Sequence, residues 1–522
     1  MSKNSIQNPT IPVDIYESCY WYGNQGCVGN LAISNAASQN NAPFLLLCEN
    51  NEQAEQSIRE LKYFCAAHDE IPILSLPDWE TLPYDNFSPH QDIISERLNT
   101  LFRLPQLKRG ILVLSITSLM HRLPPYKYIA ANTFDLIVGQ QLESELFRKQ
   151  LSLAGYQAVD SVFEHGEFAV RGSIIDIFPM GSPAPFRIDL FDDEIETLRT
   201  FNPETQRSER QVQEIKLLPG REYPLDDSGI ATFRNRFHQR FEVDPRQCPF
   251  YQDVSNAINS PGLEYYLALF FDQLSSLFEF IPENTIVISQ GDLHSVGQQF
   301  WLDIESRYED RRLDSSRPIL HPDDIFIRVD KVLSKAKGFR QIKFRKHNKA
   351  LDLGGLPLPN LASSPRLTKP FSNLQQFLHH KGTRALFCAE SLGRKQTLIE
   401  LLKQSGIKPT PVDHWSDFVD SDNTFCITVA PLDQGLWLKT EDLALITETQ
   451  LFENRIAQRR RRSKTKSNVD FLFKSLSELH INDAVVHIDH GVGRYRGLQT
   501  ITTDGHATEF LTLEYANQAI LY

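Results

Sequence analysis

The chain lacks the features of membrane and secreted proteins. No stretch of its 522 residues approaches the roughly 20 consecutive apolar residues that a membrane-spanning helix needs. The first 14 residues are polar and hold no apolar run of the kind found in secretory signals. We therefore expect a soluble, cytoplasmic protein with no membrane contact. Its seven cysteines are scattered, without any C-x-x-C pair, which predicts reduced thiols and no zinc site: Cys19, Cys27, Cys48, Cys65, Cys248, Cys388 and Cys426.

An excess of positive charge is also missing, because the formal net charge is −12. A general attraction to DNA is thereby excluded, and any contact with nucleic acid has to come from a local patch. One strongly basic run, Arg455–Lys466, includes Arg459–Arg462, Lys464 and Lys466. It fits either contacts to DNA phosphates or an acidic partner, or a solvated linker helix.

The chain lacks the lysine of a phosphate-binding loop. Such a loop follows a strand, reads G-x-x-x-x-G-K-[ST], and uses its lysine to reach the terminal phosphates of ATP. No Gly-Lys dipeptide occurs anywhere in the sequence. The stretch Cys19–Asn30 contains Gly23, Gly26 and Gly29 and precedes a helical pattern, but it has no cation. It is either a vestigial phosphate loop or an ordinary turn, and both interpretations predict no ATPase activity and no bound cofactor.

The apolar runs in the first part of the chain are typical of an α/β protein. Short, continuous apolar runs alternate with helical patterns, which predicts a parallel sheet covered by helices on both faces. The expected strands and helices are, in order, Pro43–Asn50, helix Glu52–Ala66, Ile71–Leu76, helix Asp92–Leu104, Gly110–Ile116 and Phe134–Gly139.

After Leu151 the pattern changes to short strand-like segments separated by Gly and Pro, which predicts an antiparallel, β-rich module. Helical patterns return beyond Pro219, and Pro282–Asp292 resembles another buried strand. Gly355–Pro370 is dense in Pro, Ser and Gly, as linkers are.

A second, smaller α/β pattern follows this linker. Ser391 is the expected N-cap of its helix, and Gly406 the residue just past the helix end. A last β-rich segment begins near Asp483, and the chain stops at Tyr522 inside a strand-like pattern. We therefore expect a truncated chain.

Three separated segments carry a resemblance to a known family: LPDWETLPYDNFSPHQDIISERL (Leu76–Leu98), EHGEFAVRGSIIDIFPMGS (Glu164–Ser182) and INDAVVHIDHGVGRYRGL (Ile481–Leu498). Together they resemble the bacterial transcription-repair coupling factor (Mfd) family, over essentially the whole chain. The resemblance implies a multidomain α/β fold: a degenerate RecA-like, UvrB-like domain in two segments (1–132 and 220–350), an inserted β-rich UvrA-binding domain (133–219), a linker (351–370), a small α/β domain (371–453), a basic linker helix (454–477), and the truncated start of an SH3/Tudor-like barrel that interacts with RNA polymerase (478–522).

The resemblance also implies a function. Proteins of this family recognise RNA polymerase stalled at DNA lesions, release it in an ATP-dependent way, and recruit nucleotide excision repair through UvrA. The ATP, Mg²⁺ and DNA sites of the family's motor lie beyond this chain. We therefore expect a non-catalytic, monomeric adaptor that binds UvrA and the β subunit of RNA polymerase. The alternatives are an active UvrB-like ATPase or helicase, and a transcription modulator that binds only RNA polymerase.

Residues matching the family's UvrA contacts are Arg171, Arg187 and Phe191. Because alternate residues of a strand face opposite ways, Ile188 and Leu190 are expected in a core, with Arg187, Asp189 and Phe191 on the outer side. Exposed aromatic and arginine side chains are over-represented at interface hot spots. Alternatively, the arginines pair with acidic neighbours on a solvated sheet and Phe191 packs under a loop; the candidate acids are Asp176, Asp189 and Asp192.

In the last segment, Ile501 matches a family contact to RNA polymerase. The surrounding Leu498–Thr503 has the β-propensity of an edge strand that could join a sheet of the polymerase. His487, Asp489 and His490 are spaced closely enough to raise the question of a metal. We interpret these histidines as structural and expect no metal site.

Overall fold

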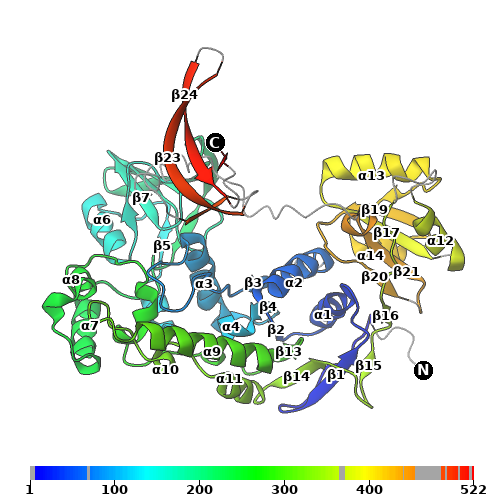
Figure 1. Cartoon of the computed structure of the whole chain (residues 1–522), viewed down its shortest axis with the longest axis horizontal. Coiled ribbons are helices and arrows are strands. Elements are labelled where there is room, and N and C mark those ends of the chain that lie inside the picture. The colour runs from blue at the N-terminus through cyan, green and yellow to red at the C-terminus, as the bar shows by residue number, and fades with distance from the viewer. Residues whose placement is uncertain are drawn as a thin grey trace. The chain divides into compact units, whose positions relative to one another are not determined.

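The computed structural model describes residues 6–67, 71–363, 371–381, 383–438, 440–452, 484–487, 491–503, 506–515 and 520–521. The chain divides into two compact units, residues 1–455 and residues 456–522 (Figure 1). The first unit contains three sheets large enough to organise a domain, and the second contains one sheet. No described helix is long and apolar enough to cross a bilayer.

A seven-stranded, entirely parallel sheet organises the largest domain, which we call the α/β domain. Its strands, in spatial order, are β15 (Leu351–Asp352), β1 (Ser18–Tyr22), β14 (Arg340–Phe344), β13 (Ile286–Ser289), β2 (Pro43–Cys48), β4 (Gly110–Ser115) and β3 (Ile73–Ser75). The prediction of a parallel sheet is therefore confirmed, and Pro282–Asp292 contributes its expected strand as β13.

Apolar clusters lie on both faces of this sheet. Leu45 and Leu47 of β2 belong to one cluster, whereas Phe44 and Leu46 belong to the other. A strand that is buried on both sides has to be continuously apolar, and all six residues of β2 and of β4 are buried. The helices of the domain are α1 (Val28–Gln39), α2 (Asn51–Phe64), α3 (Gln91–Arg103), α4 (Ile116–Leu119), α5 (Tyr126–Ala131), α7 (Asp227–Arg240), α8 (Pro249–Ser255), α9 (Leu293–Arg311), α10 (Pro322–Ile325) and α11 (Val329–Ala336).

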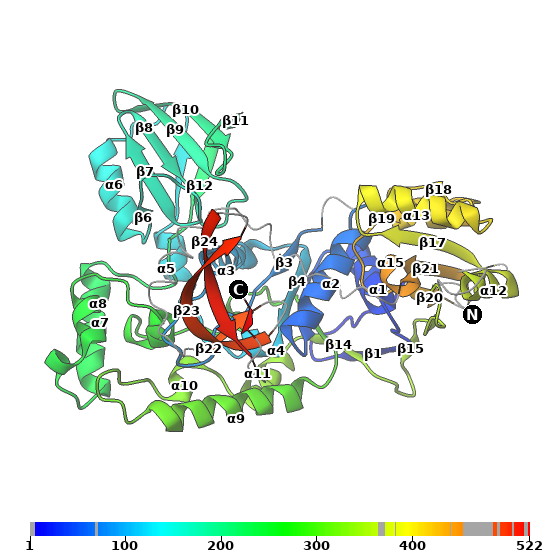
Figure 2. The ribbon, with the colours of Figure 1, turned by 45° about the horizontal axis from the view of Figure 1, so that its top comes forward.

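Between α5 and α7 lies a β-rich domain whose largest sheet has six strands (Figure 2). In spatial order these are β11 (Ser208–Val212), β10 (Glu194–Phe201), β9 (Phe186–Phe191), β8 (Ile174–Ile177), β7 (Glu167–Arg171) and β6 (Gln157–Ala158). All neighbours are antiparallel except β6 and β7. The expected β-rich module is therefore present, and it also contains helix α6 (Ser144–Leu153).

The apolar pattern placed one strand wrongly, although the family resemblance assigned the same residues to the β-rich domain (133–219). The run Phe134–Gly139 was expected beside the strands of the parallel sheet, but β5 (Phe134–Ile137) pairs antiparallel with β12 (Glu214–Leu217) in a separate two-stranded sheet. Only Leu136 of β5 is fully buried. A half-exposed strand of four residues cannot occupy the centre of a sheet that is covered on both sides.

The segment Leu76–Leu98, which carries part of the family resemblance, joins the β-rich domain to the α/β domain. Its Arg97, fully buried, donates to Glu222 at 2.7 Å. Its Asp92 contacts the ring of His165 at 2.7 Å, and the other ring nitrogen of His165 lies 2.8 Å from the carbonyl oxygen of Ser182. These polar contacts fix the β-rich domain on α3.

A small α/β domain follows. Its sheet contains, in spatial order, β16 (Gly355–Leu356), β20 (Leu436–Leu438), β21 (Leu443–Thr447), β17 (Arg384–Ala389), β19 (Phe425–Val429) and β18 (Thr410–Pro411), with helices α12 (Ser372–Lys381), α13 (Leu392–Gln404), α14 (Trp415–Asp420) and α15 (Glu448–Leu451). Ser391 caps α13 by accepting from the N–H of Arg394, as expected. Gly406, with φ of +79°, follows the end of this helix, also as expected.

The predicted linker 351–370 is partly structured. Its strand β15 pairs with β1 of the α/β domain, and its strand β16 pairs with β20 of the small α/β domain. Each of these strands has only two residues, too few to produce an apolar alternation in the sequence. The linker therefore extends both sheets by one edge strand.

The described residues of the second unit form four antiparallel strands in chain order: β22 (Ala484–His487), β23 (Gly491–Thr503), β24 (His506–Glu514) and β25 (Ile520–Leu521). β23 and β24 form a long hairpin, and a register shift occurs between Tyr495 and Gly497. Gly497 has a φ of +101°, which an L side chain rarely adopts, so glycine fits this irregular position.

Candidate functional site

The predicted UvrA contacts lie on two strands of the β-rich domain. Arg171 ends β7, whereas Arg187 and Phe191 lie on β9. Ile188 and Leu190 are buried, while Arg187 and Phe191 lie on the opposite side of the strand, so the alternation predicted from the sequence is confirmed. The side chain of Phe191 is exposed (69%) at the turn between β9 and β10.

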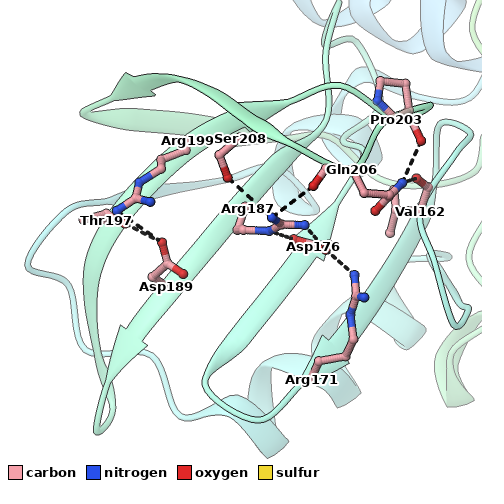
Figure 3. Close-up of polar contacts among 10 residues, drawn as sticks. All are labelled: Val162, Arg171, Asp176, Arg187, Asp189, Thr197, Arg199, Pro203, Gln206 and Ser208. Atoms are coloured by element: carbon pink, nitrogen blue, oxygen red, sulfur yellow. Dashed lines mark hydrogen bonds and ion pairs between the residues drawn. The ribbon is translucent and has the colours of Figure 1, made fainter.

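Asp176 of β8, which lies between β7 and β9, holds both arginines (Figure 3). Its carboxylate is completely buried. One oxygen accepts from Nε of Arg187 at 2.7 Å; the other accepts from Nη2 of Arg187 at 2.9 Å and from Nη2 of Arg171 at 2.6 Å. We call Arg171, Asp176 and Arg187 the arginine cluster. Its formal charge is +1, because two guanidinium groups share one carboxylate.

The two arginines are held to different degrees. The side chain of Arg187 is 18% exposed and lies over the ring of Phe201, with 5.1 Å from its guanidinium carbon to the ring centroid. It also donates to the carbonyl oxygen of Gln206 at 3.3 Å. Its hydrogen bonds to Asp176 raise the pKa of Arg187, against the opposing effect of desolvation. Arg171 makes one contact to Asp176 and is 51% exposed.

These contacts confirm one half of the alternative interpretation, the pairing of the arginines with an acidic neighbour, and contradict the other half, the burial of Phe191. Both arginines pair with an acidic neighbour, and that neighbour is Asp176. Asp189 is engaged elsewhere: Thr197 donates to it at 2.6 Å and Arg199 lies 3.8 Å away (Figure 3). The alternative that Phe191 packs under a loop is wrong, because its ring is exposed. A single acid within an apolar strand, as in Ile174–Ile177, was the signal for a buried organising carboxylate.

The glycine-rich loop lies between β1 and α1, where a phosphate loop would lie, but its backbone is engaged by other parts of the chain. The N–H of Cys27 donates to the carbonyl oxygen of Gly435 at 3.2 Å, and the carbonyl oxygen of Gly23 accepts from the N–H of Gly355 at 3.0 Å. A Cβ atom on Gly26 would lie 1.9 Å from the oxygen of Gly435. The small α/β domain therefore packs directly on the loop.

A polar cavity of about 290 Å³ lies beside this loop. Seven of its ten lining residues carry amide side chains, and Glu60 is the one charged group among the described residues that line it. Burial raises the pKa of Glu60, and Asn30 and Gln56 donate to its carboxylate at 2.6 and 2.8 Å. With a carboxylate and no lysine or arginine in its wall, the cavity is chemically unsuited to a triphosphate.

The second unit contains the predicted polymerase contact. Ile501 lies in β23 and pairs with Thr508 of β24. β22 covers the other edge of β23 only from Gly491 to Arg494, so Leu498–Thr503 has one edge unpaired by any described strand. Asp489, His490 and the basic run Arg455–Lys466 lie outside the described residues. The described part of the chain contains no cluster of three metal-ligating side chains.

Comparison with known proteins identifies the relatives of this chain. It is 39% identical to a transcription-repair-coupling factor of Haemophilus influenzae over 94% of its length, and 38% identical to one of Escherichia coli over 98%. The chain belongs to the transcription-repair-coupling factor family. It spans 43% and 45%, less than half, of these two curated relatives.

Three models of parts of such proteins match the chain. The UvrB interaction domain matches residues 134–223, the D3 domain of MFD matches 377–451, and the CarD-like/TRCF RID domain matches 479–522. The first range includes β5 through β12 and therefore the whole arginine cluster and Phe191. The candidate surface thus lies within the residues that match a domain named for an interaction.

Proposed function

We propose that this chain is a non-catalytic adaptor that links RNA polymerase stalled at DNA lesions to nucleotide excision repair. Arg171, Arg187 and Phe191 of the β-rich domain dock UvrA, and Ile501 of the second unit contacts the β subunit of RNA polymerase. The α/β domain is a degenerate RecA-like scaffold, and β22–β25 belong to an SH3/Tudor-like barrel. ATP-dependent release of the polymerase belongs to the motor of the full-length protein.

The observation that supports UvrA docking most directly is the combination, on one sheet, of an exposed aromatic ring on β9 and a net positive cluster that spans β7, β8 and β9. Arg187 and Phe191 are four residues apart, which corresponds to about 13 Å along β9. Arg171 donates to Asp176 through one nitrogen, and its other N–H groups have no partner among the described residues. UvrA would present a carboxylate to Arg171 and an apolar pocket to Phe191.

The test is a titration of UvrA against the chain and two single variants. Phe191→Ala removes a side chain that is exposed in the free protein, so it should weaken binding without destabilising the fold. A hot-spot loss of about 2 kcal/mol in binding free energy corresponds to a roughly 30-fold weaker affinity for UvrA. Arg171→Ala should weaken binding at least about tenfold, because a carboxylate of UvrA would be left unpaired.

Matched controls are available in the α/β domain. Phe87 is 70% exposed, so Phe87→Ala removes a ring of the same exposure as Phe191→Ala. Arg240 is 48% exposed and pairs with Asp324 at 3.1 Å, so Arg240→Ala matches Arg171→Ala. Unchanged UvrA affinity in both site variants, or equal losses in the controls, would refute the assignment.

Docking to RNA polymerase is supported by the open edge of β23. An unpaired strand edge offers backbone donors and acceptors to a sheet of another protein. The alternative function, a modulator that binds only RNA polymerase, is distinguished by a pull-down: it predicts capture of polymerase without UvrA.

The other alternative, an active ATPase, is disfavoured by the engaged loop and the anionic cavity. We propose that the chain holds no nucleotide and does not hydrolyse ATP. ATP turnover by the purified chain that Gly26→Ala abolishes would contradict this proposal.

A further inference from the structure

The chain carries a concentrated basic segment outside the UvrA surface. Between Lys331 and Ala350 there are eight lysines and arginines and no aspartate or glutamate, although the net charge of the whole chain is −12. The segment forms the end of α11, then β14, and then the stretch 345–349 beyond the carboxyl end of β14. β14 pairs with β1 in the parallel sheet (Figure 1).

An aromatic ring of β1 orders the cations. Tyr20 of β1 is in register with Lys343 of β14. The ring of His347 stacks on Tyr20, with centroids 4.3 Å apart and an interplanar angle of 26°. The guanidinium carbon of Arg345 lies 5.0 Å from the centroid of the same ring. Lys343, Arg345 and His347 are thereby gathered around one side chain.

Four cations of this segment are not neutralised by ion pairs, whereas Lys335 lies 4.0 Å from the carboxylate of Glu279. Lys343, Arg345, Lys346 and Lys349 form no ion pair with a described carboxylate. Arg345, Lys346 and Lys349 are exposed, and Lys343 is partly buried. Desolvation lowers the pKa of Lys343, and the positive charges of Arg345 and Lys337 lower it further. These four cations therefore have no ion-pair partner among the described residues.

We propose that Lys343, Arg345, Lys346, His347 and Lys349, arranged around Tyr20, form a binding site for the phosphate backbone of nucleic acid, which we call the basic patch. Its ligand is the phosphodiester backbone of a DNA or RNA strand, and the contact is independent of base sequence. This inference goes beyond UvrA and polymerase docking.

One observation favours a phosphate backbone over an acidic protein, and a second favours contact with the backbone over contact with the bases. Protein interfaces are centred on large apolar or aromatic anchors, yet none of the exposed large apolar side chains lies in β1 or in 337–349. Tyr20 already carries His347 and Arg345 on its ring, so base stacking is not needed for the site to form. The accessible groups are therefore the positive charges, which can contact phosphates whatever the base sequence.

The expected magnitude follows from counter-ion release. If the four Lys and Arg side chains of the patch each contact one phosphate, they contribute about −3.6 to the slope of log K against log salt on duplex DNA. Removing two of them changes that slope by about 1.8. Between 50 and 200 mM salt, the affinity ratio of wild type to variant should therefore change about 12-fold.

The experiment measures anisotropy of a labelled 20-base-pair duplex with the full 522-residue chain at several salt concentrations. Lys346→Ser/Lys349→Ser is the test variant, because both side chains are exposed and the substitutions remove their charges. Lys403→Ser/Lys408→Ser, also exposed but in the small α/β domain, is the matched control. Tyr20→Leu tests the ordering role of the ring and should weaken binding without changing the net charge.

A shallower slope in the test variant, with a wild-type slope in the control, supports the proposal. An unchanged slope in the test variant overturns it, as does a loss confined to an Arg460→Ser/Arg461→Ser variant of the separate basic run. Displacement of the duplex by poly-glutamate as readily as by unlabelled duplex would assign the patch to acidic proteins instead. A matching single strand should bind with a slope of about 0.7 per phosphate; strong preference for it would contradict backbone-only contact.

Discussion

Arg171 and Arg187 contact the same carboxylate, yet the structure predicts that their removal has very different effects on stability. Arg187→Ala removes two charge-assisted hydrogen bonds to a fully buried Asp176 and a guanidinium–ring contact to Phe201. Breaking a buried ion pair by removing one partner typically costs 3–5 kcal/mol. Because Arg171 remains beside Asp176, we expect a loss near the lower end, about 3 kcal/mol.

Arg171→Ala leaves the bidentate pair of Arg187 and Asp176 intact. Its guanidinium is half exposed and makes one contact, so the expected loss is about 1 kcal/mol or less. Replacing both buried charges, as in Asp176→Leu/Arg187→Met, should destabilise the domain less than the sum of the two single changes. A coupling of about 2 kcal/mol is expected in this double-mutant cycle.

Hydrogen exchange of the amides in β7 to β10 is the suitable assay, because it reports the local stability of one domain within a multidomain chain. Protection should fall strongly in Arg187→Ala and little in Arg171→Ala. Equal losses in the two variants, or additive effects in the cycle, would refute the view that Asp176 and Arg187 form the structural pair. UvrA affinities are then best compared through Arg171→Ala, since that variant keeps the surface folded.

Two further predictions concern the α/β domain. Burial raises the pKa of Glu264 to about 7, above its ordinary 4.5. Between pH 4.5 and pH 7 the folded state therefore binds one more proton than the unfolded state. The free energy of unfolding should fall as the pH rises through this range and then level off. In Glu264→Gln, the hydrogen-exchange protection of the α/β domain should depend less on pH in this range, and an unchanged pH dependence would contradict the prediction. Gly26→Ala places a Cβ against the oxygen of Gly435, so the amide of Cys27 should exchange faster; wild-type protection would show that the packing tolerates the change.

Some elements were predictable from the sequence because their burial or their ends can be inferred from their own residues alone. β2 and β4 are buried at every position, so their apolar runs indicate both strand and sheet type. Ser391 caps the start of α13 and Gly406 follows its end, and both lie where the sequence predicts. β5, β15 and β16 were misplaced or missed because their pairing depends on strands far away in the chain.

The strand face of the candidate residues on β9 was predictable from the sequence, whereas the contacts among the arginines and Asp176 were not. The alternation in β9 correctly separates Ile188 and Leu190 from Arg187 and Phe191. That Asp176 organises the arginines depends on β8 lying between β7 and β9, and this strand order is a property of the folded sheet. The apolar neighbours of Asp176 indicated its burial, but the sequence left three candidate acids, and the strand order shows which one lies between the two arginines.

The glycines of the loop after β1 resemble those of a phosphate loop but are required here for a different reason. In a phosphate loop, glycines let the backbone approach the phosphates. Here Gly26 has a φ of +58°, and its Cα faces the carbonyl oxygen of Gly435, where no Cβ would fit. That oxygen accepts from Cys27, so a loop N–H suited to an anion is satisfied by the small α/β domain instead. The glycine requirement therefore follows from packing between two domains, and a glycine-rich turn after a strand does not by itself indicate nucleotide binding.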